Sequence, residues 1–344
     1  MVSLRQLFVL SLALASVNAL PFNSKRQAKP EKCNGKAEFC NRKFSDVTFV
    51  GAHNSYAFSK NPLNVGRNQV VDVPTQLKLG ARMLQGQSHM DKDVLKFCHT
   101  SEWSVTHSCV PLFIHSQTDI FDGGSVEDYF GIVKKFLDEN PNEVLTLILT
   151  NPEGHSVSDV WKPIFDKSGL TPFAFAPKTE ALKASEWPTL GNLIETGKRL
   201  VVFMDAEADV SKVDFILPEF KMIWETPFSV TDENFPCKID RIDETPLNTA
   251  DHMYMINHSL NVNLVPELPK LPFGLGDKLE DIADEGVIVP DFVRADETNS
   301  IASITKHADG CAKLDGVGKK PTFVLLDWVD IGEGFDAGNR LNGL

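Results

Sequence analysis

The feature that most constrains the fold of this chain is a series of short runs rich in β-branched and apolar residues. Eight such runs are typical of strands, at residues 46–51, 81–87, 95–99, 144–150, 200–205, 221–224, 253–257 and 322–327. Continuously apolar runs suit strands that are covered on both faces, as in a parallel sheet wrapped by helices, whereas a strand with one face in water alternates.

Helical patterns lie between these runs. Residues 125–140 repeat apolar side chains every three to four positions and stop before Pro141, and residues 189–196 have an apolar face that ends at Gly197. About eight strands with intervening helices in roughly 300 residues favour one α/β domain, a distorted (β/α)8 barrel of the TIM type, over a doubly wound sheet.

The amino terminus indicates export. Arg5 precedes a short apolar stretch at residues 7–15, and small residues follow it, which is typical of a secretory signal peptide. The stretch is about half the ~20 residues that a membrane-spanning helix needs. Lys25-Arg26 resembles a dibasic propeptide site, so we expect residues 1–26 to be removed and residues 27–344 to form one extracellular domain.

Charge and hydropathy limit the partners. The chain has 47 Asp and Glu against 34 Lys and Arg, a formal net charge of −13. An acidic protein repels polyanions at long range, so we do not expect nucleic-acid binding. No segment after the signal peptide is apolar enough to span a bilayer, so we expect no transmembrane segment, and we take the protein to be a monomer.

Six cysteines in the exported part predict three disulfides, although six cysteines allow fifteen pairings. Nearest-neighbour pairing predicts Cys33–Cys40, Cys98–Cys109 and Cys237–Cys311, with residues 27–45 as a disulfide-clipped extension. No CxxC pair with histidines at ligand spacing is present, which argues against a zinc site. One glycosylation sequon begins at Asn257, and its use depends on exposure.

Polar residues follow several of the predicted strands. In a (β/α) barrel the carboxyl ends of the strands share one mouth, where catalytic groups gather. The candidates there are His53 and Asn54, Gln85, Gln87 and His89, His99, Asp205, and Asp327 with Trp328. Two imidazoles can serve a phosphodiester, because one takes the proton of the attacking hydroxyl while the other protonates the leaving oxygen.

The ordered segments VGAHNSYA (50–57), QLKLGARMLQGQSH (76–89), LKFCHTS (95–101) and FVLLDWVDIGE (323–333) resemble secreted fungal members of the phosphatidylinositol-phospholipase-C-like phosphodiesterase superfamily. The resemblance spans about residues 30 to 340 and implies a distorted (β/α) barrel. It implies that His53 is the general base, that His99 is the general acid, and that Asp327 orients the base. Asn54 matches a position that contacts calcium in one branch of the superfamily.

The chain departs from the family where the second strand ends. Calcium-dependent members have carboxylates there and metal-free bacterial members have an Asp and an Arg, whereas this chain has the neutral Gln85 and Gln87. Calcium affinity follows ligand charge, so we expect no calcium, metal or other cofactor. By alternation Arg82 points the other way. A protonated His89 is the candidate substitute cation, with an ordinary polar loop residue as the equal alternative.

A second departure is the stretch at residues 102–118, which resembles an insertion and reads either as a loop over the mouth or as a translated intron. If it is spurious, Cys98 loses its predicted partner. Within the site we expect Asn54, Gln85, Gln87, His89 and Asp205 to bind substrate. Trp328 either packs in the core or stacks on a substrate ring.

These observations leave two main hypotheses. The first is a secreted phosphoric diester hydrolase that cleaves a phosphodiester, such as a phospholipid head group, by His/His acid–base chemistry. The second is a catalytically weak or inactive barrel that binds extracellular lipid or phosphate, because two neutral glutamines replace charged groups. A transition-metal site at His53, His89 and His99 is a third alternative, since three imidazoles suffice for zinc.

Overall fold

The computed structural model describes residues 29–99 except 63 and 65, residues 121–243, residue 245, and residues 247–264 and 287–344, with only the backbone given for His99, Leu264 and Val287. The predicted signal peptide, Cys109 with its disulfide, and the segment at 102–118 lie outside the described residues.

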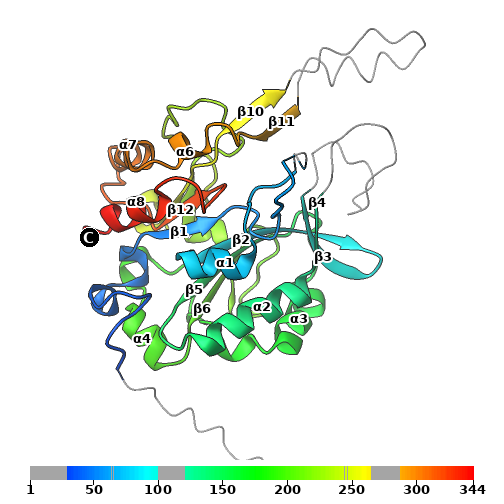
Figure 1. Cartoon of the computed structure of the whole chain (residues 1–344). Coiled ribbons are helices and arrows are strands. Elements are labelled where there is room, and N and C mark those ends of the chain that lie inside the picture. Colours follow the sequence, from blue (N-terminus) through cyan, green and yellow to red (C-terminus); the bar gives the residue numbers. More distant parts are fainter. Residues whose placement is uncertain are drawn as a thin grey trace, which may run out of the picture.

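Eight parallel strands of the described chain form one curled sheet (Figure 1). They follow one another around it in chain order, and the last strand returns to pair with the first. The strands are β1 (Phe49–Ala52), β2 (Met83–Asp91), β5 (Leu145–Thr150), β6 (Leu200–Met204), β7 (Ile216–Pro218), β8 (Ile223–Glu225), β9 (Met253–Asn257) and β12 (Phe323–Leu326). Hydrogen bonding is interrupted between β7 and β8 alone, which confirms the predicted distorted (β/α)8 barrel.

One of the eight predicted strands is misassigned. Residues 95–99 lie in β3 (Val94–His99), which runs antiparallel to β2 outside the barrel and pairs with β4 (Phe121–Ser125). In β3 the side chains of Leu95, Phe97 and Cys98 are buried, whereas Val94 is exposed and Lys96 is partly exposed. The barrel strand that the sequence analysis missed is β7, which has three residues and is too short to produce an apolar run.

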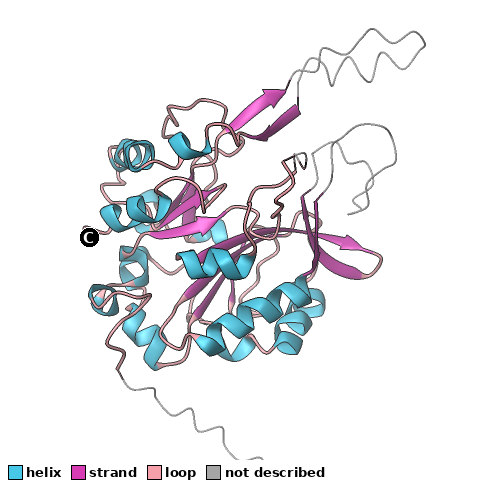
Figure 2. Cartoon of the chain, in the orientation of Figure 1, coloured by secondary structure: helices cyan, strands magenta, loops and turns pink. Residues whose placement is uncertain are grey.

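Each barrel strand sends alternate side chains to opposite faces. One core cluster takes residues from all eight strands and none from the long helices, so it fills the barrel interior; Phe49, Met83, Phe203, Met255 and Leu325 belong to it. The other cluster joins the outward-facing residues to the helices that cover the barrel (Figure 2). The strands are therefore buried on both faces, as their apolar runs predict.

The helices are α1 (Val73–Leu79), α2 (Val126–Glu139), α3 (Lys162–Ser168), α4 (Leu190–Glu195), α6 (Ala295–Thr298), α7 (Ile301–Ala312) and α8 (Gly334–Leu341), with short η turns between them. The predicted helices at 125–140 and 189–196 are confirmed as α2 and α4. The side chain of Ser125 accepts a hydrogen bond from the backbone N–H of Asp128, which caps α2 at its amino end.

The segment before β1 closes the amino-terminal end of the barrel. Its Cys33–Cys40 disulfide is present as predicted, and so is Cys237–Cys311 farther along the chain. Phe44 is fully buried and stacks on Trp187 at 4.7 Å between ring centroids, with Phe49 at 5.1 Å and Phe323 at 6.0 Å. These rings fill the interior core at the amino-terminal end of the barrel.

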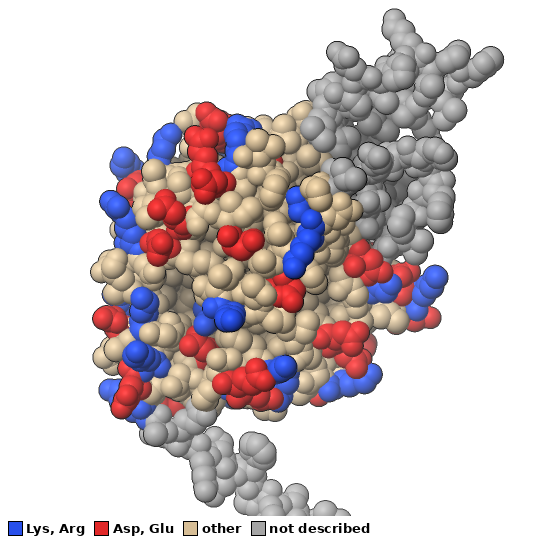
Figure 3. All heavy atoms as spheres, in the orientation of Figure 1, with Lys and Arg blue, Asp and Glu red and all other residues tan. Residues whose placement is uncertain are grey.

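A two-stranded hairpin, β10 (Asn261–Leu264) with β11 (Val287–Pro290), follows β9 at the carboxyl-terminal end of the barrel (Figure 1). None of the helices in the described part of the chain is long and apolar enough to cross a bilayer. On the face shown in Figure 3, acidic and basic side chains are interspersed, so the net negative charge does not gather there in one patch.

Candidate active site

The interior rows of the barrel change from apolar to polar at the carboxyl ends of the strands. A row here means the alternate residues of one strand that face the barrel interior. In most rows the last interior apolar residue is followed two positions later by a polar one, and in the row of Phe49 the polar residue comes four positions later. These residues are His53 after β1, Gln85 in β2, Asp205 after β6, Glu225 at the end of β8, Asn257 at the end of β9 and Asp327 after β12. Because parallel strands present their carboxyl ends at one edge, these side chains surround a common mouth.

His53 and Asp327 form the central pair of this mouth. The imidazole Nδ1 of His53 lies 2.8 Å from Oδ1 of Asp327. A carboxylate only accepts, so Nδ1 carries a hydrogen, and in a neutral ring Nε2 then keeps its lone pair. The Asp327 side chain is 3% exposed and the His53 side chain 28% exposed. A buried carboxylate therefore orients an imidazole that is open to the mouth, which is the geometry of a general base.

Asn68 holds this pair in place, although the sequence analysis did not identify it. Its Nδ2 donates to Oδ1 of Asp327 at 2.9 Å, and its Oδ1 accepts from Nδ2 of Asn54 at 3.2 Å. Its backbone carbonyl also accepts from the N–H of Trp328. A single loop asparagine has no local pattern that predicts these contacts, because both partners come from other strand ends.

Asn54 and Gln85 connect the first two strands at the mouth. The backbone N–H of Asn54 donates to Oε1 of Gln85 at 2.8 Å, and Nδ2 of Asn54 lies 3.3 Å from Nε2 of His53. Asn54 has a left-handed backbone, φ +39°, which turns its side chain toward His53. Since Oε1 of Gln85 is occupied, the Nε2 group of Gln85 is the part that remains to donate to a substrate.

Gln87 and His89 follow Gln85 along β2, but they differ in surroundings. Gln87 is half-buried, whereas His89 is 6% exposed and its Nδ1 lies 2.9 Å from Oε1 of Glu153. Burial by itself would raise the pKa of Glu153, but hydrogen bonds from Met90 N–H, His89 and His155 lower it. The carboxylate of Glu153 would thus compensate a positive charge on His89, which weakens His89 as a substitute cation.

His99 ends β3, and its backbone pairs with Phe121 of β4. The antiparallel register, Ser88 opposite Phe97, brings the end of β3 back toward Gly86 and Gln87. Tyr56, three residues after His53, stacks on Phe97 at 5.3 Å between ring centroids. The segments that carry His53 and His99 are therefore adjacent, and the role of the His99 side chain stays a prediction.

The opposite wall of the mouth carries a charged cluster that the sequence analysis found only in part. Arg241 pairs with Glu225, and Asn257 Nδ2 donates to Oε2 of Glu225 at 3.2 Å. Burial, followed by the charge of Glu225 and a hydrogen bond with it, raises the pKa of Glu219 well above its usual range. Burial also raises the pKa of Asp205. Continuing the predicted strand at 221–224 by one residue would have identified Glu225.

Trp328 packs in the core, so of its two alternatives the stacking role toward a substrate ring is the one that the structure does not support. The residue is 3% exposed, with its ring under the Arg67 guanidinium at 5.2 Å and edge-on to Phe292 at 5.0 Å. Its backbone has φ +53° immediately after Asp327. Trp328 therefore packs the turn that positions Asp327.

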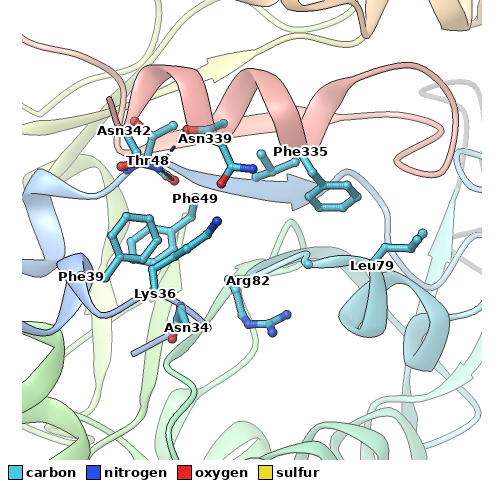
Figure 4. Close-up of a pocket in the computed structure, with 13 residues that line it drawn as sticks. Asn34, Lys36, Phe39, Thr48, Phe49, Leu79, Arg82, Phe335, Asn339 and Asn342 are labelled. Carbon is cyan, nitrogen blue, oxygen red and sulfur yellow. Dashed lines mark hydrogen bonds between the residues drawn. The ribbon is translucent and has the colours of Figure 1, made fainter. Parts of the chain in front are cut away.

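A cavity of about 210 Å³ lies at the other end of the barrel (Figure 4). Phe49 at the start of β1, Arg82 just before β2, Lys36, and Phe335 and Asn339 of α8 line it. Arg82 bonds Glu143 there, Nε to Oε2 at 2.6 Å, so it points away from the mouth as alternation predicts. No predicted site residue lines this cavity, and we therefore do not place the chemistry in it.

Comparisons with known proteins give the family. The family model PI-PLC X, described as PI-PLC X 1, matches residues 39–342. The chain is 38% identical over 340 residues to PI-PLC X domain-containing protein 1 of Arthroderma benhamiae, covering 97% of this chain and 95% of that protein. It is 37% identical over 326 residues to an uncharacterized secreted protein of the same fungus, and this match covers 92% of this chain and 65% of that protein.

Among solved structures, a pentafluoro-Phe form of phosphatidylinositol-specific phospholipase C from Staphylococcus aureus aligns over 84% of this chain and 88% of that chain. The sequence identity is 14% and the TM-score is 0.49. The family assignment rests on the sequence matches, which span nearly the whole described barrel. This chain belongs to the PI-PLC X domain family.

Proposed function

We propose that this protein is a secreted phosphoric diester hydrolase of the phospholipase-C-like type. The observation that carries the proposal is the contact of a partly open His53 imidazole with a buried Asp327 carboxylate at the barrel mouth. In the proposed reaction, Nε2 of His53 takes the proton of an attacking hydroxyl, either from the substrate itself or from water. The oxygen attacks phosphorus, and His99 protonates the departing oxygen.

Neutral donors take the place of a cation in this proposal. The Nε2 group of Gln85 donates to a phosphoryl oxygen. Gln87, two residues farther along β2 on the same face of the strand, is the second neutral donor. Hydrogen bonds from neutral amides stabilise developing negative charge less than a guanidinium does. We therefore expect slow turnover relative to family members that use an arginine or calcium.

Calcium does not fit the end of β2. Gln85 and Gln87 supply no negative charge, and Oε1 of Gln85 already accepts the N–H of Asn54. Calcium sites in proteins draw their affinity mainly from carboxylates. The proposal therefore contains no calcium-dependent step.

The charged cluster on the opposite wall favours a hydroxylated head group. Asp205 is partly exposed, and Arg241 is 33% exposed beside the buried Glu225. Carboxylates accept from hydroxyls and a guanidinium donates to them, so a polyol or glycerol group matches this wall. We propose a phospholipid head group or a related extracellular phosphodiester as the substrate.

Export is part of the same proposal. Residues 1–26 would be removed on secretion, and residues 27–344 would act as one extracellular domain. Two disulfides in the described chain suit an oxidising compartment, and one relative is named as a secreted protein.

The test measures product release from a panel of phosphodiesters, including phosphatidylinositol and glycerophosphodiesters, with and without chelator. We expect wild type to cleave at least one diester, His53→Gln to lose at least about a hundredfold of that rate, and chelator to have no effect. His155→Gln is the matched control, because His155 is half-buried with a carboxylate partner and lies outside the proposed machinery.

Equal rates for wild type and His53→Gln would overturn the catalytic assignment. Absence of turnover by wild type, combined with calorimetric binding of a non-hydrolysable diester, would favour the alternative of a barrel that binds lipid or phosphate without cleaving it.

A further inference from the structure

Two cysteines and two histidines meet outside the mouth, beside α7. The Cys237–Cys311 disulfide joins an irregular segment to α7, and His307 lies one helical turn before Cys311. The two sulfur atoms and a ring nitrogen of His307 lie within 4.8 Å of one another. Cys311 and His307 are buried, whereas Cys237 is partly exposed.

The hydrogen bonds fix which nitrogen of His307 carries the hydrogen. Nδ1 of His258 faces Nδ1 of His307, so one of these two nitrogens donates and the other accepts. Nε2 of His258 lies 2.9 Å from the carbonyl of Thr298, which only accepts, and 3.2 Å from the hydroxyl of Ser303, which can accept as well. A neutral His258 ring therefore donates through Nε2 and accepts through Nδ1.

Nδ1 of His258 lies 3.0 Å from Nδ1 of His307, so His307 must donate through Nδ1. Its Nε2 then has a free lone pair, and this buried atom has no hydrogen-bond partner among the described residues. Buried imidazole nitrogens normally have a partner, so the orphan atom requires an explanation.

We propose that Cys237, Cys311 and His307 form a metal site for a soft divalent ion such as Zn²⁺ when the disulfide is reduced. Two thiolates and one imidazole, with a fourth position for water, are a ligand set that zinc accepts. The chain from His307 through His258 to the Thr298 carbonyl matches the outer contacts that orient metal-bound histidines.

The reduction step uses an external dithiol. One thiolate of the dithiol attacks Sγ of Cys237, the exposed end, and the S–S bond breaks with Cys311 as the leaving thiolate. The second thiol of the dithiol closes its own disulfide and releases Cys237, so two electrons pass to the protein. Zn²⁺ then binds both sulfurs as thiolates, and two protons are released.

The local fold allows the sulfur atoms to separate. Zn–S bonds of about 2.3 Å in a tetrahedral site place two sulfurs about 3.8 Å apart. Cys237 lies between exposed neighbours in a stretch without regular secondary structure, whereas Cys311 lies in α7, so the proposal assigns the required movement to Cys237. Phe235 packs at 4.0 Å from the His258 ring and 5.3 Å from the His307 ring, which keeps both imidazoles fixed.

The test titrates Co²⁺, a spectroscopic probe for zinc sites, into the full-length protein before and after reduction by a phosphine. We expect the oxidised protein to show no thiolate-to-cobalt absorption and the reduced protein to bind one ion with tetrahedral bands. Zn²⁺ should displace the ion and erase the bands. Circular dichroism of each sample reports whether the barrel stays folded.

Variants locate the site. We expect Cys33→Ser/Cys40→Ser to bind Co²⁺ as wild type does, because that disulfide lies at the amino-terminal end of the barrel. We expect His307→Gln, which keeps both cysteines, to bind at least about a hundredfold more weakly, and Cys311→Ser to lose the charge-transfer band. Reduced wild type and His307→Gln with equal affinity would overturn the proposal, and so would a reduced protein that unfolds without a saturable site.

Discussion

The exchange Asp327→Asn is the sharpest probe of the proposed mechanism, because it removes one charge and almost no volume. Asparagine can still accept the hydrogen of His53 Nδ1 and of Asn68 Nδ2 through its oxygen, so the geometry of the pair is kept. When His53 takes a proton in the reaction, its ring becomes positive, and only the carboxylate of wild type stabilises that charge.

The magnitude follows from the geometry of the pair. Two unit charges about 4 Å apart attract by about 4 kcal/mol at an effective dielectric constant of about 20. Water reaches His53, whose side chain is 28% exposed, so we take about 2–4 kcal/mol. That free energy corresponds to a fall in kcat of about 30- to 1,000-fold with a smaller change in KM.

The assay is initial-rate kinetics on whichever diester wild type cleaves, with urea unfolding of the same samples. Oδ2 of Asp327 is buried without a hydrogen-bond partner among the described residues, so an amide nitrogen there should cost about 1–3 kcal/mol of unfolding free energy. Glu143→Gln is the matched control, since it also removes a carboxylate from an ion pair, at the far end of the barrel. A folded Asp327→Asn variant with the wild-type kcat would refute the reasoning.

Three further predictions concern the rest of the barrel. Phe44→Ala should lower the free energy of unfolding by about 3–5 kcal/mol in urea titration, because it empties a fully buried ring site, and a loss below about 1 kcal/mol would contradict that packing. The raised pKa of Glu219 means that the folded protein holds a proton that the unfolded chain releases above about pH 4.5, so stability falls as pH rises from there toward the raised value. Glu219→Gln should therefore lose less stability than wild type as the pH rises above about 4.5, whereas equal slopes would argue against the raised pKa of Glu219. Asn257 should carry no glycan by mass spectrometry, since its side chain is buried and donates to Glu225 and to the Thr226 carbonyl, and an occupied sequon would contradict this burial.

The barrel was predictable because the burial of a strand produces a local apolar pattern in the sequence. A strand covered on both faces is apolar at successive positions, and seven of the eight barrel strands show it. The apolar pattern cannot be detected where the strand is as short as β7. It also wrongly predicts a barrel strand where an antiparallel strand such as β3 is rich in apolar residues. Pairing direction depends on the neighbouring strand, which no local pattern encodes.

The sequence by itself placed several polar side chains at the carboxyl ends of the strands. Alternation along a strand is a local property of the backbone, so His53, Gln85 and Asp327 could be placed at the carboxyl ends of interior rows. The sequence also showed that the end of β2 has the neutral side chains of Gln85 and Gln87, because this conclusion needs only the identity of two residues.

Only the tertiary structure decided which side chains touch. Asn68 bonds Asp327 across 259 positions, and His89 meets Glu153 across 64. The pairing of Cys237 with Cys311 followed from the order of the cysteines, but the orphan nitrogen of His307 beside them did not. A hydrogen bond or a metal–ligand contact requires atoms to lie within a few ångströms, and packing of the whole barrel sets those separations.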